Sequence, residues 1–144
     1  MRAKEYLRSL KRFDVKIKNL QWELEELENK AIGISSVDYS GDNVQSSGSG
    51  DPAFVKMMPK IKAVKDELEK TIEDFVEKRH EMILMINSLS NTNYIQVLFK
   101  RYVEFKKFDD IATEMSYEVQ SVKNFHWKAI QEFERLLEVR TFDY

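Results

Sequence analysis

Seven apolar residues near the amino terminus follow each other at alternating spacings of four and three. They are Tyr6, Leu10, Phe13, Ile17, Leu20, Leu24 and Leu27. This spacing is the heptad pattern of a helix that packs along another helix. Burying these side chains contributes roughly 10 to 20 kcal/mol at about 1.5 to 3 kcal/mol each, but ordering about 25 residues costs more than that. The predicted helix therefore needs a partner along its length.

A second apolar stripe supplies that partner. Apolar residues recur every seven positions at Ile61, Leu68, Phe75, Met82 and Leu89. Residues 1–20 hold seven bases and residues 66–81 hold seven acids, so folding the chain back between them places opposite charges alongside each other. Exposed ion pairs add little stability, so this pattern indicates only the direction of pairing. We predict an antiparallel, coiled-coil-like helical hairpin over residues 1–90 with a mobile loop at 33–52.

Two further apolar features of the hairpin predict contacts beyond the seam. The run from Met82 to Ile86 is apolar around the whole helix, which indicates burial on every side. We expect the carboxy-terminal helices to cover it. Val15 and Trp22 lie seven residues apart on the back of the first helix, where an apolar pair is a candidate dimer surface.

The composition favours an all-α protein and excludes several functional classes. The 144 residues are 33% charged and 42% hydrophobic, with four Gly, two Pro and no Cys, which is typical of a helix-rich globular chain without disulfides. No apolar run approaches the roughly 20 residues of a membrane span, so we expect a cytoplasmic protein. The two histidines lack metal-ligand spacing, and the carboxylates alternate with bases. We therefore expect no metal, no cofactor and no enzymatic activity.

The carboxy-terminal third has the pattern of a helix-turn-helix. Ile111, Ala112 and Met115 share one face of a short helix, and a polar break from Ser116 to Gln120 follows. Apolar residues then recur at helical spacing along a second helix at Val122, Phe125, Ala129, Ile130 and Phe133. With a preceding helix over residues 94–105, this pattern predicts a three-helix unit over residues 94–140.

Two resemblances extend this interpretation. Phe108, Asp109, Asp110, Ile111 and Ala112, followed by Val122, Lys123, Asn124, Lys128, Ala129 and Ile130, resemble the helix-turn-helix of sigma factor region four over roughly residues 94–137. The loop at residues 42–49 and the stretch Leu98–Tyr102 resemble small proteins of Gram-positive phages and integrative elements, related to late transcription regulators of the ArpU and RinA type. These resemblances imply a transcriptional regulator that binds double-stranded DNA and contacts RNA polymerase. The role of the Ser- and Gly-rich segment 42–51 stays open.

The candidate DNA-contacting residues fall into two groups. Side chains on the second helix that packing does not require are Gln120, Ser121, Lys123, Asn124, Trp127 and Lys128. The amides of Gln120 and Asn124 are suited to adenine, and Lys123 to guanine or phosphate. Bases that flank the motif, and that could contact phosphates without reading sequence, are Lys100, Arg101, Lys106 and Lys107.

The charge balance leaves other functions open. The net charge is −2, and residues 94–144 contain eight bases against nine acids. A monomer with so few aligned cations should bind DNA weakly, so we expect a homodimer. One alternative is a helical protein-interaction adaptor without DNA binding. Another is a DNA-packaging recognition subunit, which also combines a helix-turn-helix with an oligomerising helical segment.

Overall fold

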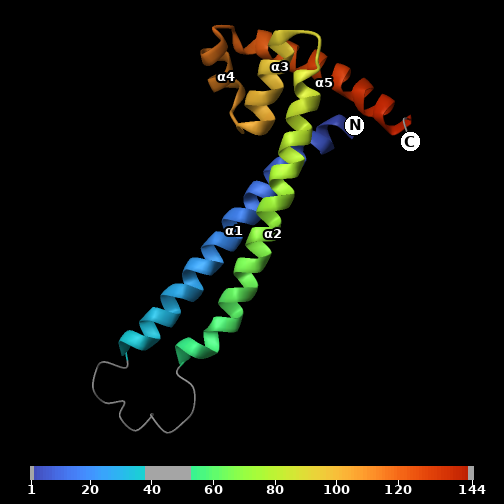
Figure 1. The fold of residues 1–144 in the computed structure, drawn as a ribbon. Coiled ribbons are helices and arrows are strands. Elements are labelled where there is room, and N and C mark those ends of the chain that lie inside the picture. Colours follow the sequence, from blue (N-terminus) through green and yellow to red (C-terminus); the bar gives the residue numbers. More distant parts are fainter. Residues whose placement is uncertain (1, 38–52, 143–144) are drawn as a thin grey trace. The chain divides into compact units, whose positions relative to one another are not determined.

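The computed structural model describes residues 2–37 and 53–142, and in this part of the chain the regular elements are all helices, joined by short connections or separated by the undescribed residues (Figure 1). The elements in order are α1 (Arg2–Val37), α2 (Ala53–Asn87), α3 (Thr92–Leu98), the π-helical turn η3 (Phe99–Val103), α4 (Phe108–Met115) and α5 (Val119–Phe142). The predicted all-α class is confirmed. Of the loop expected at residues 33–52, residues 33–37 continue α1, and residues 38–52 lie outside the described part.

The contacts within the chain define two compact units. One contains residues 1–14 and 74–144, and the other contains residues 15–73. The boundary between the units therefore crosses the interior of α1 and of α2, and does not lie between residues 90 and 94. The beginning of α1 and the end of α2 belong structurally with the carboxy-terminal helices.

The unit of residues 15–73 is an antiparallel pair of helical segments, as Figure 1 shows. The seam residues of both segments are half-buried, and Ala31 and Thr71 are buried. Thr71 keeps its hydroxyl satisfied inside the pair by donating to the Glu67 carbonyl at 2.7 Å. Val15 and Trp22 stay exposed, at 45% and 64%. The pair thus buries its seam only in part and leaves the back of α1 open.

The core of the other unit joins its three longest helical segments. Leu7 and Leu10 of α1, Met82 and Ile86 of α2, and Phe133 of α5 are fully buried in one cluster. The prediction that carboxy-terminal helices cover the end of α2 is confirmed. The prediction of burial on every side of the Met82–Ile86 run is wrong, because Leu84 is 58% exposed. Neighbouring helices pack against part of the circumference of α2, and Leu84 lies outside that part.

A smaller core holds the helix-turn-helix together. Its buried members are Val97 of α3, Ile111 and Ala112 of α4, and Val122 of α5. The helix expected over residues 94–105 is shorter than predicted, because α3 gives way to a π-helical turn that ends at Val103. Phe105 then adopts a positive φ of 60°, which turns the chain toward α4.

The corner between α4 and α5 depends on one residue in the left-handed conformation. Ser116 has φ 60° and ψ 41°. Its backbone N–H donates to the Thr113 carbonyl at 3.3 Å, and the Tyr117 N–H donates to the Ala112 carbonyl at 3.0 Å. These two bonds form a Schellman motif, which satisfies the last carbonyls of α4. Ser116 therefore ends α4 and sets the direction in which α5 begins.

The left-handed conformation at Ser116 predicts a stabilising substitution. The left-handed conformation costs an L-residue about 1 to 2 kcal/mol. Glycine avoids this cost, but it increases the entropy of the unfolded chain, which lowers the free energy of unfolding by about 0.4 to 1 kcal/mol. We expect Ser116→Gly to raise the free energy of unfolding by about 0.5 to 1 kcal/mol. Urea denaturation measures this change. Gln131→Gly, in the exposed interior of α5, should instead lower it by about the same amount. Destabilisation by Ser116→Gly would contradict the assigned corner geometry.

Candidate nucleic-acid interface

The first three turns of α5 present a polar face to solvent. Gln120, Lys123, Asn124, Trp127 and Lys128 are exposed. Of the six side chains that were predicted on this helix, only Ser121 is half-buried. The amide of Gln120 donates to Oδ1 of Asn124 at 3.2 Å, one helical turn away. The structure therefore brings the predicted group together on one helix, with two of its amides already aligned.

One flank of this face is held by His126. Its Nε2 atom shares a hydrogen bond of 2.6 Å with the hydroxyl of Tyr102. The imidazole stacks on the Tyr102 ring, and the Phe108 ring meets it edge-on. Burial lowers the pKa of His126 to about 4, with a further lowering by the positive charges of Lys4, Arg101 and Arg8. His126 is therefore a neutral packing residue at pH 7 that fixes α5 against η3 and α4.

The opposite flank is held by Phe125. Its ring lies 5.0 Å from the ring of Tyr117 and 6.5 Å from that of Tyr94, measured between centroids. The amide of Asn93 donates to the Tyr117 hydroxyl at 3.4 Å. Contacts with α3, η3, α4 and the corner thus fix the start of α5 on both sides. Such fixation is what a helix needs in order to present side chains in one defined orientation.

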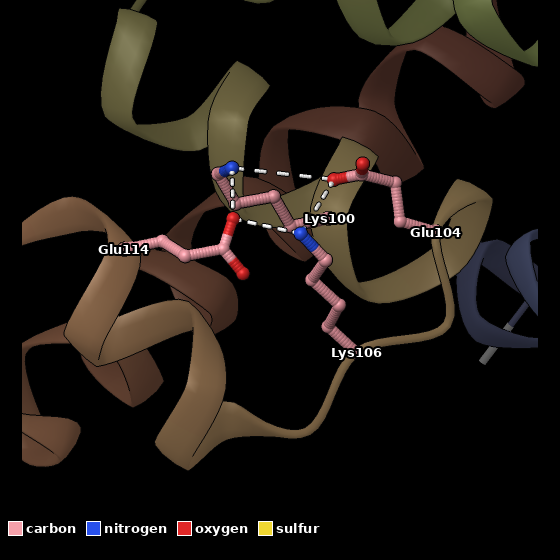
Figure 2. A network of polar contacts seen from close by, with 4 residues as sticks. All are labelled: Lys100, Glu104, Lys106 and Glu114. Atoms are coloured by element: carbon pink, nitrogen blue, oxygen red, sulfur yellow. Dashed lines mark hydrogen bonds and ion pairs between the residues drawn. The ribbon is translucent and has the colours of Figure 1, made fainter.

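Two of the predicted phosphate-contacting bases, Lys100 and Lys106, take part in an ion-pair network (Figure 2). Oε1 of Glu114 accepts hydrogen bonds from Lys106 at 2.7 Å and from Lys100 at 2.9 Å. Oε1 of Glu104 lies 3.6 Å from the Lys106 ammonium and 4.0 Å from that of Lys100. The network connects η3 and the segment after it to α4.

This network has consequences for the local charge. Two ammonium groups face two carboxylates, so the four side chains together carry no net charge. The hydrogen bonds from Lys100 and Lys106 lower the pKa of Glu114, and the hydrogen bond to Glu114 raises the pKa of Lys106. Both shifts favour the ionised forms of Glu114 and Lys106. A phosphate would therefore have to compete with Glu104 and Glu114 for these lysines.

The other two flanking bases differ from each other. Arg101 donates to the Lys106 carbonyl at 3.0 Å, and its guanidinium lies over the Phe108 ring at 4.3 Å. Lys107 is exposed and immediately precedes α4. Arg101 thus stabilises the turn before α4, whereas the side chain of Lys107 is exposed to solvent.

The sequence interpretation missed bases at the start of α1. Lys4, Arg8 and Arg101 each contribute to lowering the pKa of His126, so α1 brings positive charge close to one flank of α5. The excess of bases in residues 1–20 could have indicated this role, but the sequence analysis explained it only by pairing with the acidic stretch of α2. Their spacing of four along α1, at Lys4 and Arg8, also indicates a shared helical face.

Other kinds of site find little support in the described residues. Across residues 2–37 and 53–142, no group of three or more His, Cys, Asp or Glu side chains is arranged to hold a metal ion. Within the same residues, none of the helices has an apolar stretch long enough to cross a membrane.

The buried histidine predicts a pH dependence of stability. In the unfolded chain His126 binds a proton near pH 6.5, and in the folded protein only near pH 4. Stability from this group is complete above about pH 7, falls as the pH drops toward 4, and falls no further below it. Allowing for the partial exposure of the ring, we expect a loss of roughly 1 kcal/mol between pH 7 and pH 5. Urea denaturation at both pH values measures it.

Two variants isolate the contribution of His126. His126→Gln should remove this part of the pH dependence, because glutamine does not titrate. His80→Gln removes an exposed histidine and should keep the wild-type difference between pH 7 and pH 5. Equal pH dependence in wild type and His126→Gln would rule out a buried, neutral His126.

Comparison with known proteins identifies a family. The family described as "Protein of unknown function (DUF1492)" matches residues 33–134, a region that contains α2, the helix-turn-helix and most of α5. The chain matches no curated protein and no solved structure. Because the matched region is well over half of the sequence, this chain belongs to the DUF1492 family.

Proposed function

We propose that this protein is a DNA-binding transcriptional regulator of a phage or mobile element, located in the cytoplasm, which inserts α5 into the major groove. The observation that carries the proposal is the exposed polar face at the start of α5, opposite a face that is fully used in packing. Val122, Ala129 and Ile130 are buried, while Lys123, Asn124 and Trp127 are exposed. A helix held in this way is the reading element of helix-turn-helix proteins.

The chemistry of the exposed face fits base edges. An amide side chain can donate one hydrogen bond to adenine and accept one from it. An ammonium group can donate to the acceptor atoms of guanine or to a phosphate. Gln120 and Asn124 provide two such amides one turn apart, and their mutual hydrogen bond of 3.2 Å reduces the freedom that each would lose on binding. Lys123 lies between them in sequence, near the end of α5 that would approach the bases.

A dimer compensates for the small number of bases that each chain can offer to DNA phosphates. The chain carries a net charge of −2, and Lys100 and Lys106 are already paired with carboxylates. Two copies double the number of phosphate contacts and match the two half-sites of a palindromic operator. The exposed Val15 and Trp22 on the back of α1 are the proposed dimer surface. A contact with RNA polymerase would convert occupancy of a promoter into activation.

The reading role of α5 predicts a specific loss of DNA binding. A sequence selected from random duplexes provides the probe, and fluorescence anisotropy measures the dissociation constant. We expect Lys123→Ala with Asn124→Ala to weaken binding to the selected duplex at least tenfold, because each base contact contributes about 1 to 3 kcal/mol. Binding to random duplex should weaken less, since Lys123 is the only charge removed.

A matched control removes the same residue types elsewhere. Asn29→Ala with Lys30→Ala changes two exposed residues of α1 in the other unit. This variant should bind the selected duplex with wild-type affinity. If both double variants bind equally well, α5 does not read the bases.

The proposed dimer surface predicts an effect of Trp22 on assembly. We expect static light scattering to give the mass of two chains for the wild type and of one chain for Trp22→Glu, because a carboxylate in an apolar interface loses its hydration without gaining a partner. The monomer should bind the palindromic duplex at least tenfold more weakly. Trp22→Phe keeps an apolar ring and should remain dimeric. A monomeric wild type would contradict the proposal of a dimer.

The adaptor function is the second candidate, and the near-neutral charge favours it. Its interaction surface would be the exposed apolar residues of α1 and α2, such as Trp22, Ile32 and Met58. Titration with random duplex separates the two functions, since a regulator retains duplex at low salt and releases it steeply as salt rises, whereas an adaptor retains none. A ring of eight or more chains in light scattering would instead favour a DNA-packaging subunit.

A further inference from the structure

Two adjoining hollows lie along the start of α1, the first of them between α1 and η3, and all their lining residues belong to one compact unit. One hollow has a volume of about 230 Å³ and is lined by Leu7, Arg8, Lys11, Arg101, Tyr102 and Phe105. The other has a volume of about 700 Å³ and is lined by Glu5, Arg8, Lys11 and Arg12. Arg8 and Lys11 line both, so we treat the two hollows as one basic cleft.

The basic cleft carries excess positive charge over an apolar floor. Four of its lining residues are bases, and Glu5 is the one acid among them. Lys11 lies 3.6 Å from Asp14 and places its ammonium 4.8 Å from the centre of the Phe105 ring. The low-dielectric floor weakens screening of the bases by water, which strengthens their attraction for an anion. The chemistry of the cleft therefore fits an anionic group.

The backbone is strained at Phe105, one of the apolar residues that line the cleft. Phe105 has φ 60°, a conformation that glycine adopts far more readily than an aromatic residue. A glycine at this position would relieve the strain but would remove the ring beneath Lys11. Strain of this kind tends to occur at binding sites, where the surrounding structure maintains it.

The basic cleft adjoins the flank of α5. Tyr102, which lines the cleft, shares its hydroxyl hydrogen bond with His126. Arg8 and Arg101 line the cleft and, together with Lys4, lower the pKa of His126, so their positive potential reaches α5. Lys123 lies three residues before His126 and thus on a neighbouring position of the same helix side. Through Tyr102 and His126, the cleft thus reaches the part of α5 that carries Lys123.

We propose that the basic cleft binds backbone phosphates of the duplex whose major groove α5 enters, an inference that rests on the proposed function. Arg8 supplies a planar guanidinium that is always charged and can bind two phosphate oxygens at once. Lys11 and Arg12 supply further donors along the same side of α1. These residues take over the role that was predicted for Lys100 and Lys106, whose charges Glu104 and Glu114 neutralise.

The salt dependence of DNA binding tests the inference. The variant is Arg8→Gln with Lys11→Gln in the full chain, and the measurement is the affinity for random and selected duplex between 50 and 200 mM salt. Each phosphate contact contributes about 0.9 to the slope of log affinity against log salt. We expect the slope to fall by about 2, so that the wild type loses roughly tenfold more affinity over this range than the variant. The loss at low salt should be equal for both duplexes, because phosphate contacts do not read sequence.

A matched control and an ion probe separate the outcomes. Lys60→Gln with Lys65→Gln removes two exposed lysines of α2 in the other unit and should keep the wild-type slope. Circular dichroism should show unchanged helix content in both variants. A wild type that binds no duplex at 50 mM salt overturns the proposed function, and the inference with it. If the wild type binds duplex and the cleft variant shows the same slope, the inference alone is overturned. Inorganic phosphate is the ion probe: if it stabilises the wild type through Arg8 and Lys11 while the two slopes are equal, the cleft binds a free anion and not the duplex, and the inference is still overturned.

Discussion

One apolar stripe of α5 serves two cores, and the rest of the described fold around it depends on this double use. At its start, Val122 packs with α3 and α4 in the helix-turn-helix core. From Ala129 onward, Ile130, Phe133 and Leu137 pack with the start of α1 and the end of α2. Because a single helix joins the two cores, α5 cannot rotate to bury its polar residues without exposing both. The stripe therefore also determines which face remains in water.

Polar contacts refine the arrangement that this stripe establishes. The Tyr102–His126 hydrogen bond and the network around Glu114 connect η3 to α5 and α4, respectively. They also decide which positive charges remain open to a polyanion. Lys100 and Lys106 are both paired with Glu114. Arg8 and Arg12 instead line a hollow in which Glu5 is the one acid among the lining residues, and Lys11, which lines the same hollow, lies 3.6 Å from Asp14. A small protein of nearly neutral charge can bind an anion in this way only if its acids and bases are separated locally.

Several features could be predicted from the sequence because they depend on local periodicity. The heptad spacing from Tyr6 to Leu27 predicted a long paired helix, and the spacing from Val122 to Phe133 predicted the buried side of α5. The exposed positions of Gln120 and Asn124 follow from the same periodicity. Leu84 shows its limit, since an apolar run predicts burial but does not reveal how many neighbours the helix has. Five of the six residues predicted on α5 are exposed on one face, and their contact with DNA stays a prediction.

The sequence by itself determined the two long helices, the helix-turn-helix pattern and the polar composition of the α5 face, because these depend on residues within a few turns of each other. Only the tertiary structure decided that residues 1–14 join the carboxy-terminal helices, that Glu104 and Glu114 together neutralise Lys100 and Lys106, and that Arg8 lies near Arg101 in one hollow. The physical reason is that ion pairing and burial depend on distance in space. Residues separated by about a hundred positions come together only when the chain has folded.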